Sequence, residues 1–215
     1  MTNRISIRPA RPDDAPLAAA IFRLSLDHLA DYLFGPDGRA TEVALMRLFS
    51  LNAGRFGYEH AFVAELNRRP LGMLVAFPGS DINRLNLAVV RYLPRALGWR
   101  MFGFMARGLT LAGNKEAETD EYLVSNIGVL PAAQGHGLGK RLLLQADEQA
   151  RNLGLKKVSL MVALENHTAQ RLYKRNGYKI VFTKHDKNPF ASYHRMVKEL
   201  ITACTVPQAH VKTDH

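Results

Sequence analysis

The sequence predicts an α/β (α+β) fold built on a mixed sheet. Two apolar runs, AFVAEL and PLGMLVAFP, are separated only by NRR, as in a β-hairpin. The periodic segments follow the order β-α-α-β-β-β-α-β-α-β-β. This order lacks the regular alternation of strand and helix that an all-parallel sheet requires, so the sheet is expected to be mixed.

The first strand and helix are predicted from hydrophobic periodicity. In RISIRPA, Ile5 and Ile7 alternate with polar residues, as in a strand with one buried face. Two aspartates then precede Pro16, and apolar residues recur at helical spacing as far as Leu29. We therefore expect one helix here, ended by the GPDG that follows it.

The later elements are predicted from capping residues and glycine stops. Thr41 is the expected N-cap of a second helix that runs to about Leu51. DEYLVSNIGVL is predicted as a strand, and helical periodicity runs from Gly137 to about Leu153, with Gly154 as its stop. KKVSLMVAL is a further strand, HTAQRLYKRNG a short helix, and GYKIVFTK and ASYHRMVKEL the final strands.

The length of the chain fits one domain over residues 1–200, followed by a flexible polar tail at 201–215. Residues 81–120 form an insert rich in apolar residues between the third and fourth strands. Several arginines interrupt it, which argues against a membrane span. We expect two amphipathic helices broken at Pro94. Their apolar faces could pack on the core, on a partner chain, on a membrane surface or over an active site, and the core or a partner chain is favoured.

Composition limits the classes of partner and the compartment. The formal net charge is +10, but the basic residues are spread along the chain without a dense run, so nucleic-acid binding is not expected. The single cysteine, Cys204, excludes an internal disulfide framework. This cysteine count and the lack of a signal-peptide pattern predict a cytoplasmic protein.

The motif QGHGLGKRLL lies between a predicted strand and a predicted helix. Gly135, Gly137 and Gly139 give G-x-G-x-G, whereas a dinucleotide fingerprint has its last glycine where Lys140 stands. A Walker A loop would need glycine in place of Gln134. Amides at a helix start still favour a pyrophosphate, although a plain turn with glycines for tight packing explains the motif equally well.

Two linked motifs decide between these interpretations. The turn spells Q-x-x-G-x-G directly after I-G-V-L-P, and ENHTAQRLYKRNGY follows at residues 165–178. Together they resemble the acyl-CoA pyrophosphate motif and the N-x-x-A-x-x-L-Y-x-x-x-G-[FY] motif of the GNAT superfamily of acyl-CoA-dependent N-acyltransferases. The resemblance implies a mixed, mostly antiparallel central sheet flanked by helices, with the helical insert between the third and fourth strands.

The resemblance also implies a site for acetyl-CoA as co-substrate, with no metal. The turn would bind the pyrophosphate, the preceding strand would pair with the pantetheine arm, and an amide near Val129 would polarise the thioester carbonyl. Asn166 would contact the arm or cap its own helix. The coenzyme-binding residues implied are Ile127, Val129, Gln134, Gly135, His136, Gly137, Leu138, Gly139, Lys140 and Asn166.

Catalytic roles follow from the same resemblance. Tyr173 matches the general acid that protonates the departing thiolate, although core packing is its alternative role. Leu123 stands where some relatives carry a glutamate, so Glu121, two residues earlier on the same strand face, is the expected base through a water. Further candidates for the base are Asp120, His28, Tyr32 and His194.

The predicted function is direct transfer of an acetyl group from acetyl-CoA to an amine acceptor in a ternary complex. Two alternatives stay open: a non-catalytic acyl-CoA-binding module, and an acyltransferase that uses longer acyl-CoA donors. The acceptor is an amine of a small molecule or a protein. A homodimer is compatible with the resemblance, and no stable membrane span is expected.

Overall fold

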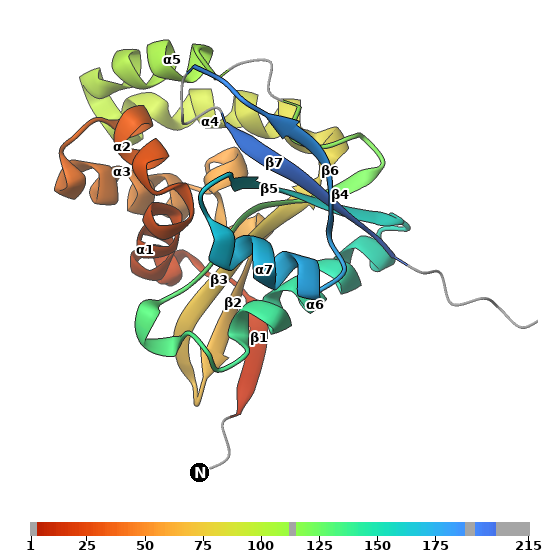
Figure 1. Cartoon of the computed structure of the whole chain (residues 1–215). Helices are drawn as coiled ribbons and strands as arrows, with labels where there is room; N and C mark the ends of the chain where they lie inside the picture. The colour runs from red at the N-terminus through yellow and green to blue at the C-terminus, as the bar shows by residue number, and fades with distance from the viewer. Residues whose placement is uncertain (1–3, 112–114, 188–191, 201–215) are drawn as a thin grey trace, which may run out of the picture.

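The computed structural model describes residues 4–111, 115–187 and 192–200. Its centre is a seven-stranded sheet in the order β1-β2-β3-β4-β5-β7-β6 (Figure 1). Only β4 and β5 are parallel neighbours, and the other neighbouring pairs are antiparallel, which confirms the predicted mixed sheet. The strands are β1 (Ile5–Pro9), β2 (Ala61–Leu66), β3 (Arg69–Pro78), β4 (Glu121–Val129), β5 (Lys157–Ala163), β6 (Lys179–Lys184) and β7 (Tyr193–Glu199).

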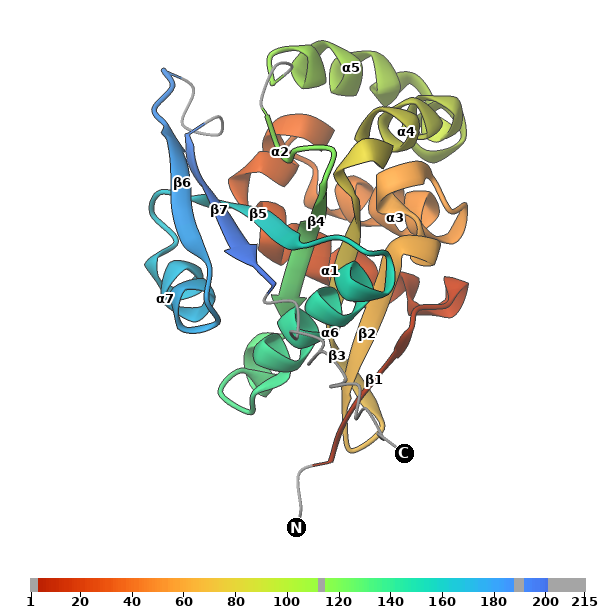
Figure 2. The same ribbon diagram turned by 90° about the vertical axis from the view of Figure 1, so that its right-hand side faces the viewer.

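Helices cover both faces of this sheet (Figure 2). Side chains of α1, α3 and α4 pack with Met73 and Val75 of β3 on one face. Side chains of α6 and α7 pack with Leu74 and Ala76 on the other, as strand alternation requires. The helices are α1 (Ala15–Leu26), α2 (His28–Phe34), α3 (Gly38–Ser50), α4 (Ile82–Leu97), α5 (Met101–Leu109), α6 (Leu138–Asn152) and α7 (His167–Arg175).

The single helix expected before GPDG is two helices. Asp27 takes φ 48° and separates α1 from α2. Leu26 and Leu33 nevertheless pack against the same core cluster. The apolar period therefore continues across the break and hides it.

The prediction that Thr41 is the N-cap of the next helix is wrong. α3 begins at Gly38, and Asp37 is its N-cap, because the Asp37 carboxylate accepts a 3.0 Å hydrogen bond from the Ala40 amide. Thr41 lies inside the helix and is fully buried, and its hydroxyl donates to the Gly35 carbonyl. Two residues in this segment can cap a helix, and the one nearer the GPDG turn does so.

The insert between β3 and β4 is helical, as predicted, but it does not break at Pro94. α4 continues through Pro94 to Leu97, and the break falls at Gly98, which has φ 55°. Proline removes the N–H that would bond to the Val90 carbonyl one turn earlier. Both residues are exposed, so water can satisfy that carbonyl and the helix persists.

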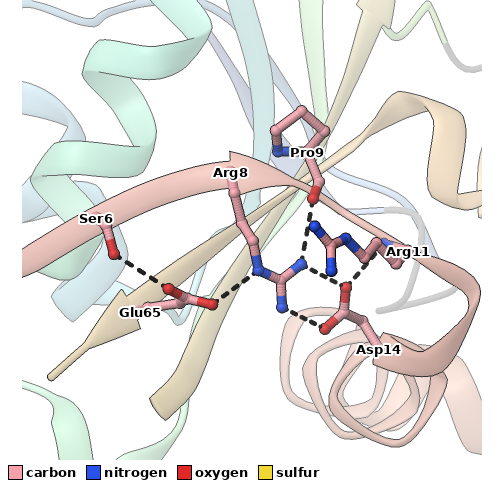
Figure 3. A network of polar contacts seen from close by, with 6 residues as sticks. All are labelled: Ser6, Arg8, Pro9, Arg11, Asp14 and Glu65. Atoms are coloured by element: carbon pink, nitrogen blue, oxygen red, sulfur yellow. Dashed lines mark hydrogen bonds and ion pairs between the residues drawn. The ribbon is translucent and has the colours of Figure 1, made fainter. Parts of the chain in front are cut away.

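A network of charges joins the end of β1 to β2 and α1 (Figure 3). The Arg8 guanidinium contacts both carboxylate oxygens of Asp14 at 2.8 Å and one of Glu65 at 2.7 Å. Burial raises the pKa of Asp14, but its hydrogen bonds with Arg8 and the Arg11 amide outweigh burial and lower it. The hydrogen bond from Arg8 lowers the pKa of Glu65. Both carboxylates are therefore held in the charged form.

None of the helices in the described part of the chain has the length and apolarity needed to span a bilayer. Residues 201–215, including Cys204, lie outside the described residues.

Candidate active site

β4 and β5 separate halfway along their length. They pair in parallel from Glu121 opposite Lys157 to Val124 opposite Leu160. β4 then continues to Val129, and over this half only β3 pairs with it among the described strands. The second half of β4 therefore has one open edge, where backbone groups are available to a ligand.

A β-bulge lies where the two strands part. Asn126 is opposite Val75 of β3 and Val124 is opposite Ala76. Ser125 is therefore an extra residue in β4 that has no residue opposite it in β3. The bulge brings neighbouring polar side chains together: the Ser125 hydroxyl donates to the Asn126 Oδ1 at 3.2 Å. Strict strand alternation would have placed these two side chains on opposite faces.

The backbone beyond the bulge determines which amides face the open edge. The Leu130 N–H donates to the Leu71 carbonyl at 2.8 Å, on the β3 side. Since alternate residues of a strand direct their N–H groups to opposite sides, Ile127 and Val129 direct theirs to the open edge. The Gln134 side-chain amide donates to the Val129 carbonyl at 3.2 Å, which ties the following turn to the strand end.

The glycine turn after β4 depends on backbone conformations that favour glycine. Gly135 has φ 83° and Gly137 has φ 87°, and Gly137 is the N-cap of α6. His136 Nδ1 lies 3.1 Å from the Gln134 carbonyl oxygen, a contact within the turn. Leu138 is buried and anchors the start of α6 in the core.

The start of α6 has the electrostatics of an anion site. Its N-cap is a glycine without a side chain, so the first amides of the helix have no side-chain cap. The helix dipole adds partial positive charge at this end. Lys140 and Arg141 are exposed in the first turn and add full charges. This arrangement can bind a phosphate or pyrophosphate group.

α7 lies close to the same turn. A Cβ added at Gly139 would lie 3.2 Å from the Leu172 Cδ2 atom, so this glycine allows α6 and α7 to approach each other. The Asn166 Oδ1 accepts a 3.0 Å hydrogen bond from the Ala169 amide and caps α7, as the capping interpretation predicts.

Tyr173 of α7 is buried beside a second tyrosine. Its ring centroid lies 6.0 Å from that of Tyr178. Burial raises the pKa of Tyr173 to about 12. The phenol is therefore protonated at neutral pH and has a proton to donate.

Glu121 lies at the opposite end of β4 from the glycine turn. Its side chain is buried, forms an ion pair with Arg195 of β7, and accepts a 3.0 Å hydrogen bond from the Glu118 amide. Arg195 also donates to the Glu116 carbonyl at 3.4 Å. These contacts fasten the loop that enters β4, and they occupy the carboxylate of Glu121 as an acceptor.

The remaining candidates for the base lie in other surroundings. Asp120 is exposed and pairs with Lys157 at 3.0 Å. His194 Nδ1 lies 2.8 Å from the Thr183 hydroxyl, and burial lowers the pKa of this histidine. The Tyr32 hydroxyl lies 2.7 Å from that of Thr110, and His28 is exposed at the start of α2.

A pair of charges that the sequence analysis missed lies beside the bulge. Arg55 contacts the two carboxylate oxygens of Glu116 at 2.6 and 2.8 Å, and it donates to the Ser125 hydroxyl at 3.0 Å. Burial raises the pKa of Glu116, but the charge and hydrogen bonds of Arg55 outweigh burial and lower it. The Asn126 amide donates to the Ser25 hydroxyl at 2.9 Å, which continues this polar wall to α1.

Comparison with known proteins identifies this arrangement. The model of the Acetyltransferase (GNAT) family matches residues 26–178, well over half of the chain. The chain belongs to the GNAT acetyltransferase family.

Individual GNAT proteins match this chain over only part of its length. Mycothiol acetyltransferase of Mycobacteroides abscessus is 34% identical over 127 residues, covering 48% of this chain and 43% of that protein. The uncharacterized N-acetyltransferase YycN of Bacillus subtilis is 31% identical over 70 residues, or 33% of this chain and 45% of that protein. The chain thus spans less than half the length of these curated relatives.

The solved structure of an acetyltransferase superposes with a TM-score of 0.70 at 22% identity, covering 91% of this chain and all of that one. At this identity the likeness establishes the GNAT fold.

Within this GNAT fold, most of the predicted coenzyme-binding residues lie along one continuous path. The path runs down the open edge of β4, through the turn at 134–137 and into α6, with α7 beside it. The predicted base Glu121 does not lie on this path, because it is at the other end of β4. The described residues contain no group of three or more His, Cys, Asp or Glu side chains placed to hold a metal ion.

Proposed function

We propose that this GNAT protein is an N-acetyltransferase that moves an acetyl group from acetyl-CoA to an amine by direct attack in a ternary complex. The observation that carries the proposal is the open edge of β4 that leads directly into the positive-φ glycine turn at the start of α6. This arrangement offers main-chain groups to an extended arm and unpaired amides to a pyrophosphate. The single cysteine supports a cytoplasmic protein.

The chain's own residues fit the coenzyme. The amides between Gln134 and Lys140 would hold the pyrophosphate, and Lys140 would add charge. The main chain of Ile127 and Val129 would pair with the pantetheine arm. The Val129 amide would donate to the thioester carbonyl as negative charge develops on its oxygen, and one such donor is worth about 3 kcal/mol in comparable sites.

Tyr173 is proposed as the general acid. The acceptor nitrogen forms a bond to the thioester carbon, and the carbon–sulfur bond breaks. The departing thiolate takes the phenolic proton of Tyr173, while the nitrogen gives up its own proton to a base. Burial keeps Tyr173 protonated over the range in which an amine loses its proton, which supports this role.

Either of two carboxylates, acting through a water, is proposed as the base. Glu121 is the candidate from strand position, but its carboxylate is already engaged by the ion pair with Arg195. Glu116 lies beside the bulge, where its partner Arg55 also binds Ser125, and this position favours it although Arg55 lowers its pKa. Loss of the acid-side limb of the kcat/KM profile, which reports protonation of the base, in Glu116→Gln or in Glu121→Gln would select between them.

The test of the function is thiol release from acetyl-CoA with a panel of amino acids, polyamines, aminoglycosides and peptides with free N-termini. Turnover with at least one amine is expected. Tyr173→Phe should lower kcat about 100-fold or more with an unchanged Kd for acetyl-CoA. Tyr178→Phe is the matched control and should retain turnover.

Three other results would redirect the proposal. Tight binding of acetyl-CoA without turnover on any amine would identify a non-catalytic binding module. Faster turnover with octanoyl-CoA than with acetyl-CoA would identify an acyltransferase for longer donors. A covalent acyl-enzyme seen by mass spectrometry would exclude direct attack.

A further inference from the structure

The short helix α5 has its arginines on the inner side. Arg100 donates to the Phe34 carbonyl at 2.8 Å, and Arg107 donates to the Leu33 carbonyl at 3.1 Å, so both bind the last carbonyls of α2. The ring of Phe104 packs on Phe34 with centroids 4.9 Å apart. These contacts fix one face of α5 on α2, at the rim of the molecule (Figures 1 and 2).

The outer side of the same segment is apolar. Trp99 is 88% exposed, Phe102 59%, Met105 40% and Leu109 74%. Phe102, Met105 and Leu109 share one face of α5 by their spacing. Trp99 lies in the 3-10 turn (Gly98–Arg100) directly before the helix, and its ring is 6.1 Å from that of Phe102. We call these four residues the α5 stripe. A surface helix normally carries polar residues on its outer side, so this orientation needs a partner that accepts apolar side chains.

The charges around the α5 stripe indicate the chemistry of that partner. Residues 82–111 contain five arginines and no aspartate or glutamate. Arg91 and Arg95 are exposed on the last two turns of α4, the helix that precedes Trp99 in the chain. A second copy of the chain would bring its own arginines to the contact, and the like charges of the two copies would repel each other. An anionic surface complements both the apolar stripe and its cationic border.

We infer that α4 and α5 form a peripheral docking surface for a bilayer that contains anionic lipids. The stripe would enter the boundary between headgroups and acyl chains, with Trp99 at headgroup depth, and Arg91 and Arg95 would lie against the lipid phosphates. This is surface binding and does not require a spanning segment. It is independent of the proposed acetyl transfer, because no residue of the glycine turn or of α7 takes part.

The chain carries its own probe, because Trp99 is its single tryptophan. We expect vesicles of phosphatidylcholine with phosphatidylglycerol to shift its emission to the blue and to protect it from an aqueous quencher. Vesicles of phosphatidylcholine alone should do so far more weakly, and added salt should reverse the binding. No emission change with the anionic vesicles would overturn the inference.

Variants separate the apolar and ionic parts while keeping the probe. Phe102→Ser with Leu109→Ser should abolish binding. Arg91→Gln with Arg95→Gln should weaken partition about 30-fold, since each arginine near an anionic surface adds about a fivefold factor. Leu153→Ser, at an exposed leucine of the α6 end, is the apolar control and should bind as the parent protein does.

A second copy as the occupant predicts a different set of results. The Trp99 emission would shift with protein concentration in the absence of lipid, and sedimentation would show a dimer that Phe102→Ser with Leu109→Ser dissociates. That outcome, or equal partition of the Arg91→Gln/Arg95→Gln variant and the parent protein, would contradict membrane docking. All substituted side chains are exposed, so circular dichroism should show the parent fold.

Discussion

Arg55 donates a hydrogen bond to the hydroxyl of Ser125, 3.0 Å away, and Ser125 is the bulged residue at which β4 leaves β5. The same guanidinium binds both oxygens of Glu116 in the loop that leads into β4. One side chain therefore connects a short 3-10 turn, the end of the insert and the bulge. Ser125 in turn donates to Asn126, and the Asn126 amide donates to Ser25, so a chain of hydrogen bonds runs from Arg55 through the bulge to α1.

Replacing Arg55 by alanine should lower the free energy of unfolding by about 2 kcal/mol. Glu116 would then keep a mostly buried negative charge without its partner, which costs more than the net value of the pair. Chemical denaturation of Arg55→Ala, Glu116→Gln and the double variant measures the coupling. The double variant should be more stable than Arg55→Ala alone. Strictly additive losses would contradict an interaction between the two side chains.

An element of the fold could be predicted when its sequence signals lie within or beside the element itself. The strands and α6 have strong periods, and their caps or stops lie within a few residues, so their positions were predicted to within about one or two residues. The break at Asp27 was missed because the apolar period passes through it unchanged. The break at Pro94 was predicted wrongly because an exposed turn can leave one carbonyl to water.

The residues of the candidate site also divide into those with a local sequence signal and those without one. The glycine turn and α7 lie within motifs, so their residues could be assigned from the sequence. Arg55 and Glu116 could not, because neither AGRFG nor KEAETD forms a recognisable motif and the two residues lie about 60 residues apart in the chain. The bulge at Ser125 depends on pairing with β3, and a single strand carries no signal for it.

Gly135→Ala should weaken acetyl-CoA binding about tenfold, while Gly154→Ala should leave it unchanged. The two glycines are matched, since each has a positive φ, 83° and 72°, and a Cβ at either would meet no atom within 4 Å. Each alanine should lower the free energy of unfolding by about 1 kcal/mol through backbone strain. Only Gly135 lies in the proposed pyrophosphate turn, where one lost charge-assisted hydrogen bond accounts for about tenfold. Calorimetric titration with acetyl-CoA checks the difference, and equal affinities would remove this turn from the coenzyme site.

Arg8→Met should lower the free energy of unfolding by about 1–2 kcal/mol at neutral pH and by less in acid. Asp14 and Glu65 have folded-state pKa values below their ordinary values of 3.8 and 4.5. Their contribution is therefore present above those values and is lost as the pH falls through the folded-state values. Urea denaturation at about pH 7 and about pH 3 measures this change. Arg69→Met, at an exposed arginine of β3, is the control. A loss that stayed constant with pH would show that Arg8 acts through packing alone.

Pro94→Ala should raise the free energy of unfolding by about 1–3 kcal/mol, because α4 already passes through this position. Alanine restores the N–H that can bond to the Val90 carbonyl, and no packing is lost at an exposed site. Pro94→Gly restores the same N–H with a poorer helix former, so it should stabilise by about 1 kcal/mol less than alanine does. Thermal unfolding of the three proteins should therefore give the order alanine, glycine, proline. If the protein with proline were the most stable of the three, the restriction that proline places on the unfolded chain would outweigh the missing hydrogen bond, and the prediction would be wrong.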